Sequence, residues 1–241
     1  MFVFIYSLFS YVVGVASVAY LVGWMVGIAP GAFGGPLGEE LLPGIVWDLV
    51  LLALFGLQHS VMARQSFKDS LIKMVPVAAE RSTYILMTGV VIFVMVGFWS
   101  PYSALAWEFS DLLETLLWCL VALGWIFMLS ASFGTNHFEL FGLRQAWLHM
   151  RGVPYTELEF TRSGIYGYIR HPIQTGILVG IWCLPVMRVD NLLMNIGITI
   201  YIAIGLWFEE RDLIANFGED YRRYKAEVGG LLPKLGGRRN S

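Results

Sequence analysis

The chain has 241 residues, of which 57% are apolar and 14% are charged, and its formal net charge is −2. Soluble domains carry roughly 25% charged residues, so one globule of this length cannot bury all the apolar residues and lipid must act as the solvent. The composition therefore excludes an ordinary soluble domain and favours an integral membrane protein. The near-neutral charge identifies no partner, and we expect no nucleic-acid partner.

Long stretches without Asp, Glu, Lys or Arg predict the membrane spans, because about 20 helical residues cross roughly 30 Å of hydrocarbon. The full-length candidates lie near residues 4–28, 44–62, 83–100 and 112–132. The first has no basic segment before it and is too long for a cleaved signal peptide, so we expect it to be retained. The last two stretches, 173–187 and 191–208, are shorter and either cross tilted or form a protected hairpin. We therefore expect an all-α bundle of five to six transmembrane helices, forming a single domain over residues 1–241.

Basic residues gather on one side of this topology. With six spans, every Lys and Arg except Arg188 falls in the 62–81 loop, the 134–172 connector or the tail after residue 208. The positive-inside rule places that side in the cytoplasm together with both termini, as in a multi-pass protein of the cell's inner membrane. The Gly/Pro-rich segment 30–36 then faces outward, and we expect a flexible turn there because no Lys-Ser/Thr follows to make a phosphate-binding loop.

The two cysteines, Cys119 and Cys183, lie within apolar stretches, so we expect them to be small buried hydrophobic residues. The chain has no Cys/His pattern with zinc-ligand spacing. We therefore expect neither a disulfide nor a metal site.

A basic triplet and a Gly/Tyr segment stand where the apolar hairpin begins. Pro172 suits the first turn of a helix, which puts His171 near the N-cap, where backbone N–H groups attract anions. Arg170 and His171 would add charge and hydrogen bonds for a carboxylate or phosphate. The alternative is a positive-inside anchor before an ordinary helix start. In the segment 164–168, glycines allow close backbone approach and tyrosines offer ring faces for a base or a cation, unless they are only interfacial belt residues.

Glu209 and Glu210 stand together where the last apolar stretch ends. Two like charges at a bilayer boundary are unfavourable unless they are solvated, paired or bound to a cation. An acidic pair, an anion-binding helix start and a Gly/Tyr segment together suit a zwitterionic, aromatic and positively charged ligand. S-adenosylmethionine has this form, and we expect its pocket at the cytoplasmic edge of the bilayer.

Other polar residues fall on the same predicted side and are candidates to line this pocket. His59 ends the second span, Arg81 opens the third, and His137 and Arg144 follow the fourth. A histidine near a helix end is also a common structural residue, so the alternative for His59 and His137 is a satisfied hydrogen-bonding role.

The C-terminal motifs resemble the signature of the isoprenylcysteine carboxyl methyltransferase superfamily of integral membrane methyltransferases. The matching residues are Gly164-x-Tyr166, Arg170-His171-Pro172, Glu209-Glu210-x-x-Leu213 and Phe217-Gly218-x-x-Tyr221-x-x-Tyr224. Upstream segments at 54–64, 80–84 and 136–147 are similar to one bacterial branch, the methanethiol S-methyltransferases.

This resemblance implies S-adenosylmethionine as the methyl donor and a cofactor-binding region within residues 164–224. It implies cofactor contacts for Gly164, Tyr166, Arg170, His171, Glu209 and Glu210. One position departs from the family, which usually has tyrosine two residues after the proline where this chain has Gln174. An amide can hydrogen-bond but offers no ring face, so the pose of the cofactor or the acceptor is expected to differ.

The implied reaction converts methanethiol to dimethyl sulfide by direct in-line transfer, in which the protein aligns the two sulfur atoms and excludes water. The thiolate is the effective nucleophile. We expect His59 or His137 to accept the thiol proton, Arg81 or Arg144 to stabilise the thiolate, and Glu210 to be needed for the reaction. Methanethiol is apolar enough to arrive through membrane lipid, and no obligate protein partner is evident.

Three alternatives remain open. The same cofactor would serve another thiol, an isoprenylated cysteine or a lipid amine as acceptor. A membrane reductase with a related C-terminal region would bind NADPH, although a 2′-phosphate would favour more clustered arginine than this chain offers. A transporter or scaffold is disfavoured because the chain has no two-fold repeat and Asp48, expected at the interface, is the only ionisable residue in a span.

Overall fold

The structure is a computed structural model that describes residues 1–31, 33, 41–102, 104–156 and 162–234. Residues 32 and 34–36 of the predicted Gly/Pro-rich turn therefore lie outside the described ranges. The chain divides into two compact units. Unit 1 comprises Met1–Ala106, His137–Glu157 and Met187–Gly197, and unit 2 comprises Trp107–Asn136, Leu158–Val186 and Ile198–Ser241.

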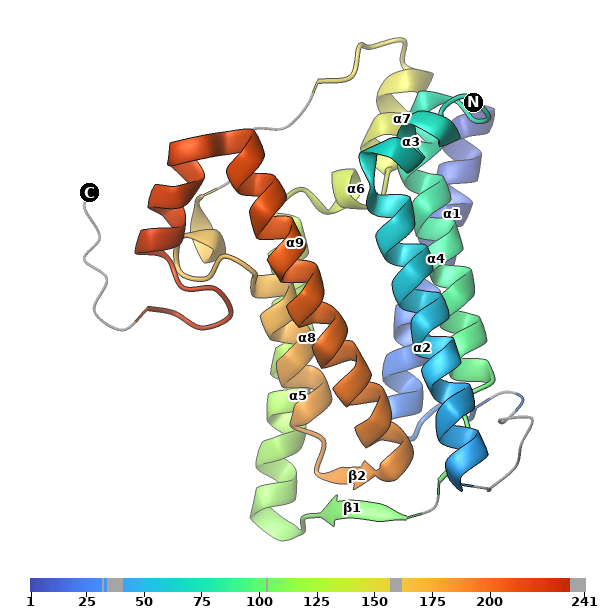
Figure 1. The fold of residues 1–241 in the computed structure, drawn as a ribbon, viewed down its shortest axis with the longest axis vertical. Helices are drawn as coiled ribbons and strands as arrows, with labels where there is room; N and C mark the ends of the chain where they lie inside the picture. The colour runs from blue at the N-terminus through green and yellow to red at the C-terminus, as the bar shows by residue number, and fades with distance from the viewer. Residues whose placement is uncertain (32, 34–40, 103, 157–161, 235–241) are drawn as a thin grey trace. The chain divides into compact units, whose positions relative to one another are not determined.

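Helices make up almost all of the regular structure (Figure 1). In chain order the elements are α1 (Phe2–Met25), α2 (Leu41–Ala63), α3 (Gln65–Leu71), the 3₁₀ helix η1 (Val77–Ala79), α4 (Glu80–Gly97), β1 (Leu105–Glu108), α5 (Asp111–Gly134), α6 (His137–Leu140), α7 (Leu143–Met150), the 3₁₀ helix η2 (Gly164–Gly167), α8 (Pro172–Trp182), β2 (Val186–Arg188) and α9 (Val189–Glu227). The strands β1 and β2 pair as a small sheet that the sequence pattern did not predict.

Five helices in the described part of the chain, namely α1, α2, α4, α5 and α9, are long and apolar enough to cross a membrane. The sixth predicted span corresponds to α8, which is apolar but has only 11 residues. The all-α, multi-pass architecture with five to six spans is therefore confirmed.

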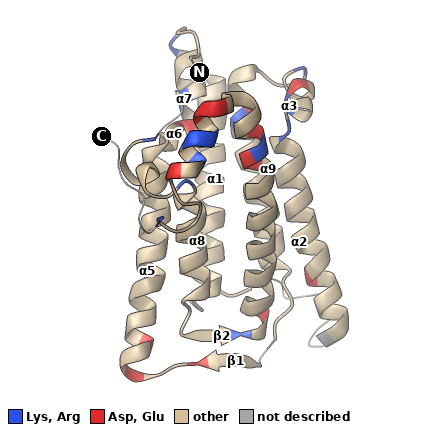
Figure 2. Ribbon diagram, turned by 60° about the vertical axis from the view of Figure 1, so that its left-hand side comes forward, with Lys and Arg blue, Asp and Glu red and all other residues tan. Residues whose placement is uncertain are grey.

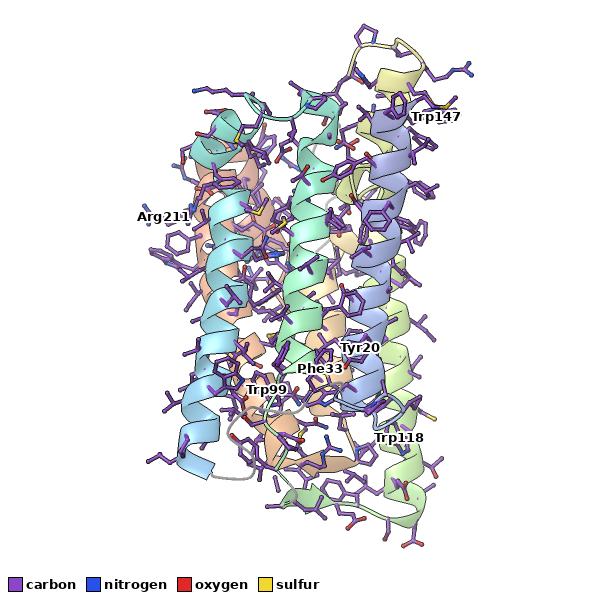
Figure 3. All side chains as sticks on the ribbon, turned by 90° about the vertical axis from the view of Figure 1, so that its right-hand side faces the viewer. Tyr20, Phe33, Trp99, Trp118, Trp147 and Arg211 are labelled. Carbon is purple, nitrogen blue, oxygen red and sulfur yellow. The ribbon has the colours of Figure 1, made fainter. Side chains whose placement is uncertain are left out.

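Small side chains bring α1 and α4 together in unit 1. Ser7, Ser10, Gly14 and Ser17 recur at steps of three or four on the buried face of α1. The Ser82 hydroxyl of α4 donates a hydrogen bond of 2.7 Å to the Ser7 oxygen. Small residues let helix backbones approach closely in lipid, where the hydrophobic effect does not drive helices together. Toward the other end of α1, Tyr20, Phe33 and Trp99 mark an aromatic region of the same unit (Figure 3).

Asp48 is fully buried in α2 and does not lie at an exposed interface as the sequence suggested. Its carboxylate accepts hydrogen bonds from the Ser100 backbone N–H at 2.9 Å and the Tyr102 hydroxyl at 3.2 Å. These bonds tie the segment after α4 to α2, because a buried carboxylate must be satisfied inside the protein.

In unit 2, α5 and α8 cross where both helices carry glycine. A Cβ atom on Gly124 would lie 2.6 Å from the Gly180 nitrogen, and one on Gly176 would lie 2.6 Å from the Gly124 oxygen. The helices therefore approach to a distance that only glycine permits. The charges of α9 gather in its second part, after Phe208, and the rest of the helix is apolar (Figure 2).

Candidate functional site

The predicted site residues form two groups, each inside one unit. Gly164, Tyr166, Arg170, His171, Gln174, Glu209 and Glu210 belong to unit 2. His59, Arg81, His137 and Arg144 belong to unit 1.

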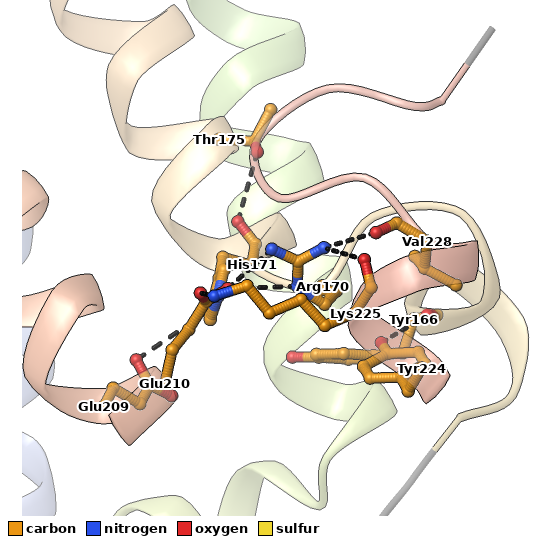
Figure 4. A network of polar contacts seen from close by, with 9 residues as sticks. All are labelled: Tyr166, Arg170, His171, Thr175, Glu209, Glu210, Tyr224, Lys225 and Val228. Atoms are coloured by element: carbon orange, nitrogen blue, oxygen red, sulfur yellow. Dashed lines mark hydrogen bonds and ion pairs between the residues drawn. The ribbon is translucent and has the colours of Figure 1, made fainter. Parts of the chain in front are cut away.

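Glu210 is the centre of a charge cluster in unit 2 (Figure 4). One carboxylate oxygen, Oε1, accepts bonds from Arg170 Nε at 3.0 Å and Nη2 at 2.6 Å, and lies 3.1 Å from His171 Nε2. The other oxygen lies 2.6 Å from Lys225 Nζ. The Arg170 and Glu210 side chains are only 10% and 15% exposed. Glu210 is thus engaged by protein cations, which makes it a structural anchor.

Glu209 has a different environment although it is the next residue. Its carboxylate lies 3.9 Å from His171 Nδ1, and its side chain is 49% exposed. The sequence suggested an equivalent pair, whereas the helix turns the two carboxylates to different neighbours. Glu209 is therefore the better placed of the two to meet a positive charge on a ligand.

The start of α8 is bonded to the C-terminal segment 228–231. The backbone N–H groups of Arg170 and His171 donate to the carbonyls of Gly229 at 2.8 Å and Gly230 at 3.1 Å. His171 is the N-cap and Pro172 the first residue of α8, as predicted. The expectation that this backbone offers its N–H groups to an anion is wrong for Arg170 and His171, because the chain itself fills those positions.

Side chains strengthen the same attachment. The Arg170 guanidinium donates through Nη1 to the carbonyls of Val228 and, at 3.2 Å, Lys225. The Thr175 hydroxyl donates to the Leu231 carbonyl at 2.7 Å. Arg170 is therefore held on one side by a carboxylate and on the other by backbone oxygens, which fixes its position. Gln174 lies in the first turn of α8, half-buried beside Thr175.

The predicted Gly/Tyr loop is a short 3₁₀ helix, η2. Gly164 opens it with φ of +60°, a left-handed conformation that favours glycine. The buried Tyr166 donates from its hydroxyl to the Ala131 carbonyl at 3.3 Å, and its own carbonyl accepts from the Tyr224 hydroxyl at 2.6 Å. Burial raises the pKa of Tyr166 above its ordinary value, so the phenol stays protonated. Tyr166 is thus part of the packed wall of unit 2.

In unit 1, His59 lies between α2 and α4. Its Nε2 is 2.6 Å from the Tyr84 hydroxyl and its Nδ1 is 3.3 Å from the Thr88 hydroxyl. The Arg81 guanidinium lies over the Tyr84 ring, 5.1 Å from its centroid, and its Nε donates to the Leu140 carbonyl at 2.9 Å. His59 and Arg81 are therefore brought close to one another, as the prediction of a shared site required.

His137 is buried, with 4% of its surface exposed, at the start of α6. Its Nε2 lies 3.0 Å from the hydroxyl of Tyr11 on α1. Burial lowers the pKa of His137 below its ordinary value of 6.5, because removal from water disfavours the charged ring. The imidazole is thus neutral near pH 7, the state that a proton acceptor needs.

Arg144 pairs with Glu139 at 2.8 Å. The same carboxylate accepts from the Gln145 amide at 2.8 Å and the Tyr155 hydroxyl at 2.6 Å. This cluster fixes the connector after α6, and it balances the charge of Arg144.

Sequence reasoning missed several residues that complete these two groups. Lys225 appeared only as one of many basic residues in the tail, and Tyr11 lies in a span where nothing singled it out. The carbonyls of segment 228–231 carry no sequence signal, since a backbone oxygen is present at every position.

Whole-chain comparisons show strong similarity to characterised membrane enzymes. The chain is 42% identical to the methanethiol S-methyltransferase of Mycobacterium tuberculosis over 235 residues, which cover 95% of each chain. It is 37% identical to the enzyme of that name from Crocosphaera subtropica, over 98% of this chain and 93% of the relative. Nurim of Bos taurus is more distant, at 27% identity over 73% of this chain and 70% of its own. No protein-family model matches the chain, and no solved structure matches it significantly.

Proposed function

The chain belongs to the methanethiol S-methyltransferase family, and on that premise we propose that it methylates methanethiol to dimethyl sulfide. The observation that carries this proposal is the extent of the similarity, which covers nearly the full length of both chains. The membrane setting agrees with it, because a small apolar thiol partitions into lipid.

We propose S-adenosylmethionine as the methyl donor, bound by unit 2. The half-exposed Glu209 carboxylate and the adjacent His171 suit the positive groups and the carboxylate of such a ligand. Arg170 and Glu210 hold His171 in place by their shared contacts. When bound, this donor supplies a methyl group that its sulfonium already activates. The remaining predicted contacts, Gly164, Tyr166 and Gln174, would then shape the wall of the cofactor site.

Unit 1 supplies the groups suited to the thiol. A thiol at neutral pH is mostly protonated, so a base that accepts its proton raises the concentration of the nucleophilic thiolate. His59 and His137 are the candidate bases, and the positive charge of Arg81 favours a thiolate over a thiol. Arg144 serves less well, since Glu139 already balances its charge.

The distribution of Lys and Arg supports a location in the inner membrane, with the basic connections and both termini in the cytoplasm if α8 completes a sixth crossing. This orientation puts the charged end of α9 on the side where a cytoplasmic cofactor is available.

The test is headspace dimethyl sulfide from purified protein in detergent, given methanethiol and S-adenosylmethionine. We expect product from the wild type and a large loss in Glu209→Gln. The matched control is Glu219→Gln, which removes an exposed carboxylate from the same helix. Equilibrium binding of radiolabelled S-adenosylmethionine and NADPH distinguishes the alternatives. Cofactor binding without product would point to a larger thiol, an isoprenylated cysteine or a lipid amine, and binding of NADPH alone would indicate a reductase.

A further inference from the structure

Unit 1 contains two tyrosine–histidine pairs, Tyr11 with His137 and Tyr84 with His59. We propose that Tyr11 is a positioning residue that orients His137, and that His137 is the base that takes the proton of the acceptor thiol. This inference rests on the proposed thiol methylation and decides between the two histidines that the sequence left open.

The contacts of Tyr11 fix the His137 ring from two directions. The hydroxyl lies 3.0 Å from Nε2, and the two rings meet edge-on with centroids 5.7 Å apart and an interplanar angle of 85°. Phe141 packs against both rings, with centroids 5.3 Å from Tyr11 and 4.7 Å from His137. An imidazole held this firmly has one defined orientation, which is the arrangement of a base and its orienting partner.

The electrostatic surroundings of the two histidines differ. The partner of His59 lies directly beneath the guanidinium of Arg81, so an imidazolium at His59 would face a fixed positive charge. The partner of His137 is the neutral hydroxyl of Tyr11, and the lowered pKa of His137 has burial as its cause. Arg81 is better suited to a thiolate than to a neighbouring imidazolium, which leaves proton uptake to His137.

The proposed step balances as follows for methanethiol. The S–H bond breaks and its proton passes to the imidazole, while the Tyr11 oxygen accepts the hydrogen of Nε2 and stabilises the imidazolium. The sulfur electron pair forms the new S–C bond, and the C–S bond of the sulfonium donor breaks with its electron pair retained by the donor sulfur. The imidazolium then releases its proton to water.

The experiment compares Tyr11→Phe with wild type using two acceptors, methanethiol and methaneselenol. A selenol is nearly the same size but is already ionised at neutral pH, so it does not need a base. Phenylalanine keeps the ring contacts and removes only the hydroxyl. The structural control is Tyr6→Phe, which also removes a hydroxyl bond between α1 and α4, here to Thr83 at 2.9 Å, without touching a histidine.

We expect kcat of Tyr11→Phe with methanethiol to fall roughly 10-fold or more, since general bases contribute at least that much. We expect KM, cofactor affinity and the melting temperature to match those of Tyr6→Phe, and the loss with methaneselenol to be much smaller. Equal losses with both acceptors, or no loss, would overturn the proposal. So would a thiol-specific loss in Tyr84→Phe that is absent from Tyr11→Phe, because that result assigns the base to His59. If the wild type accepts no methaneselenol, the split between kcat and KM in Tyr11→Phe decides. Absence of dimethyl sulfide from the wild type would instead refute the proposed function itself.

Discussion

Replacing Glu210 by Gln separates the structural carboxylate of unit 2 from its exposed neighbour. In wild type, Glu210 accepts two bonds from Arg170 and contacts His171, and both Arg170 and Glu210 are largely buried. Hydrogen bonds to charged groups contribute about 1.5–3 kcal/mol each, and removing one partner of a buried ion pair costs about 3–5 kcal/mol. Gln keeps an acceptor oxygen, and Lys225 is 44% exposed and screened by water, so we take the low end, about 3 kcal/mol.

For a protein of this length, 3 kcal/mol corresponds to roughly 6–12 °C in melting temperature. Glu209→Gln is the matched comparison, because it removes the same charge one residue away from a contact of 3.9 Å. We expect that variant to melt within about 1 °C of wild type while binding S-adenosylmethionine more weakly. The assay is thermal unfolding in detergent, with and without S-adenosylmethionine. Equal melting temperatures for Glu210→Gln and Glu209→Gln would refute the assignment of Glu210 as the anchor.

Three further variants test other features. Gly124→Ala should destabilise unit 2 by about 1–3 kcal/mol, because its Cβ would meet the α8 backbone at 2.6 Å, whereas Gly205→Ala has open space and should not; similar melting temperatures would contradict this packing. The neutral, low-pKa His137 adds stability above about pH 6.5 that is lost as the pH falls, because the unfolded state then binds the proton more readily. His137→Gln should therefore lose less stability than wild type between about pH 7.5 and 5.5, and parallel curves would contradict it. Thr175→Val should expose segment 228–231 to limited proteolysis sooner than in wild type, and an unchanged cleavage rate would show that its bond holds nothing.

The membrane spans were predictable because apolar length is a strong signal that each segment carries by itself. The predicted spans near 44–62 and 112–132 agree with α2 and α5 to within a few residues. The start of α8 was equally readable, since Pro172 is restricted to the first turn of a helix. The strands β1 and β2 were not, because strands this short form only where the fold brings their backbones together.

The site was predictable in its residue types and less so in its internal connections. Arg170, His171 and Glu210 do meet, as their spacing suggested. The division of labour between Glu209 and Glu210 depends on helix rotation and on Lys225, which no motif joins to them. The role of Tyr11 depends on the packing of α1 against the connector, which a single sequence does not encode locally.

The attachment of Arg170 to segment 228–231 orders the events of biosynthesis. The arginine and its Val228 carbonyl partner are separated by 58 positions, so the ribosome adds α8 and the whole of α9 between them. All the membrane helices are thus synthesised before Arg170 acquires its backbone partners. A message with a premature stop codon in the last turn of α9 would yield a membrane-embedded protein in which Arg170 and the start of α8 lack these carbonyls. Such a product would retain its spans yet present an incomplete charge cluster, which makes the final residues of segment 228–231 the point at which the cluster becomes complete.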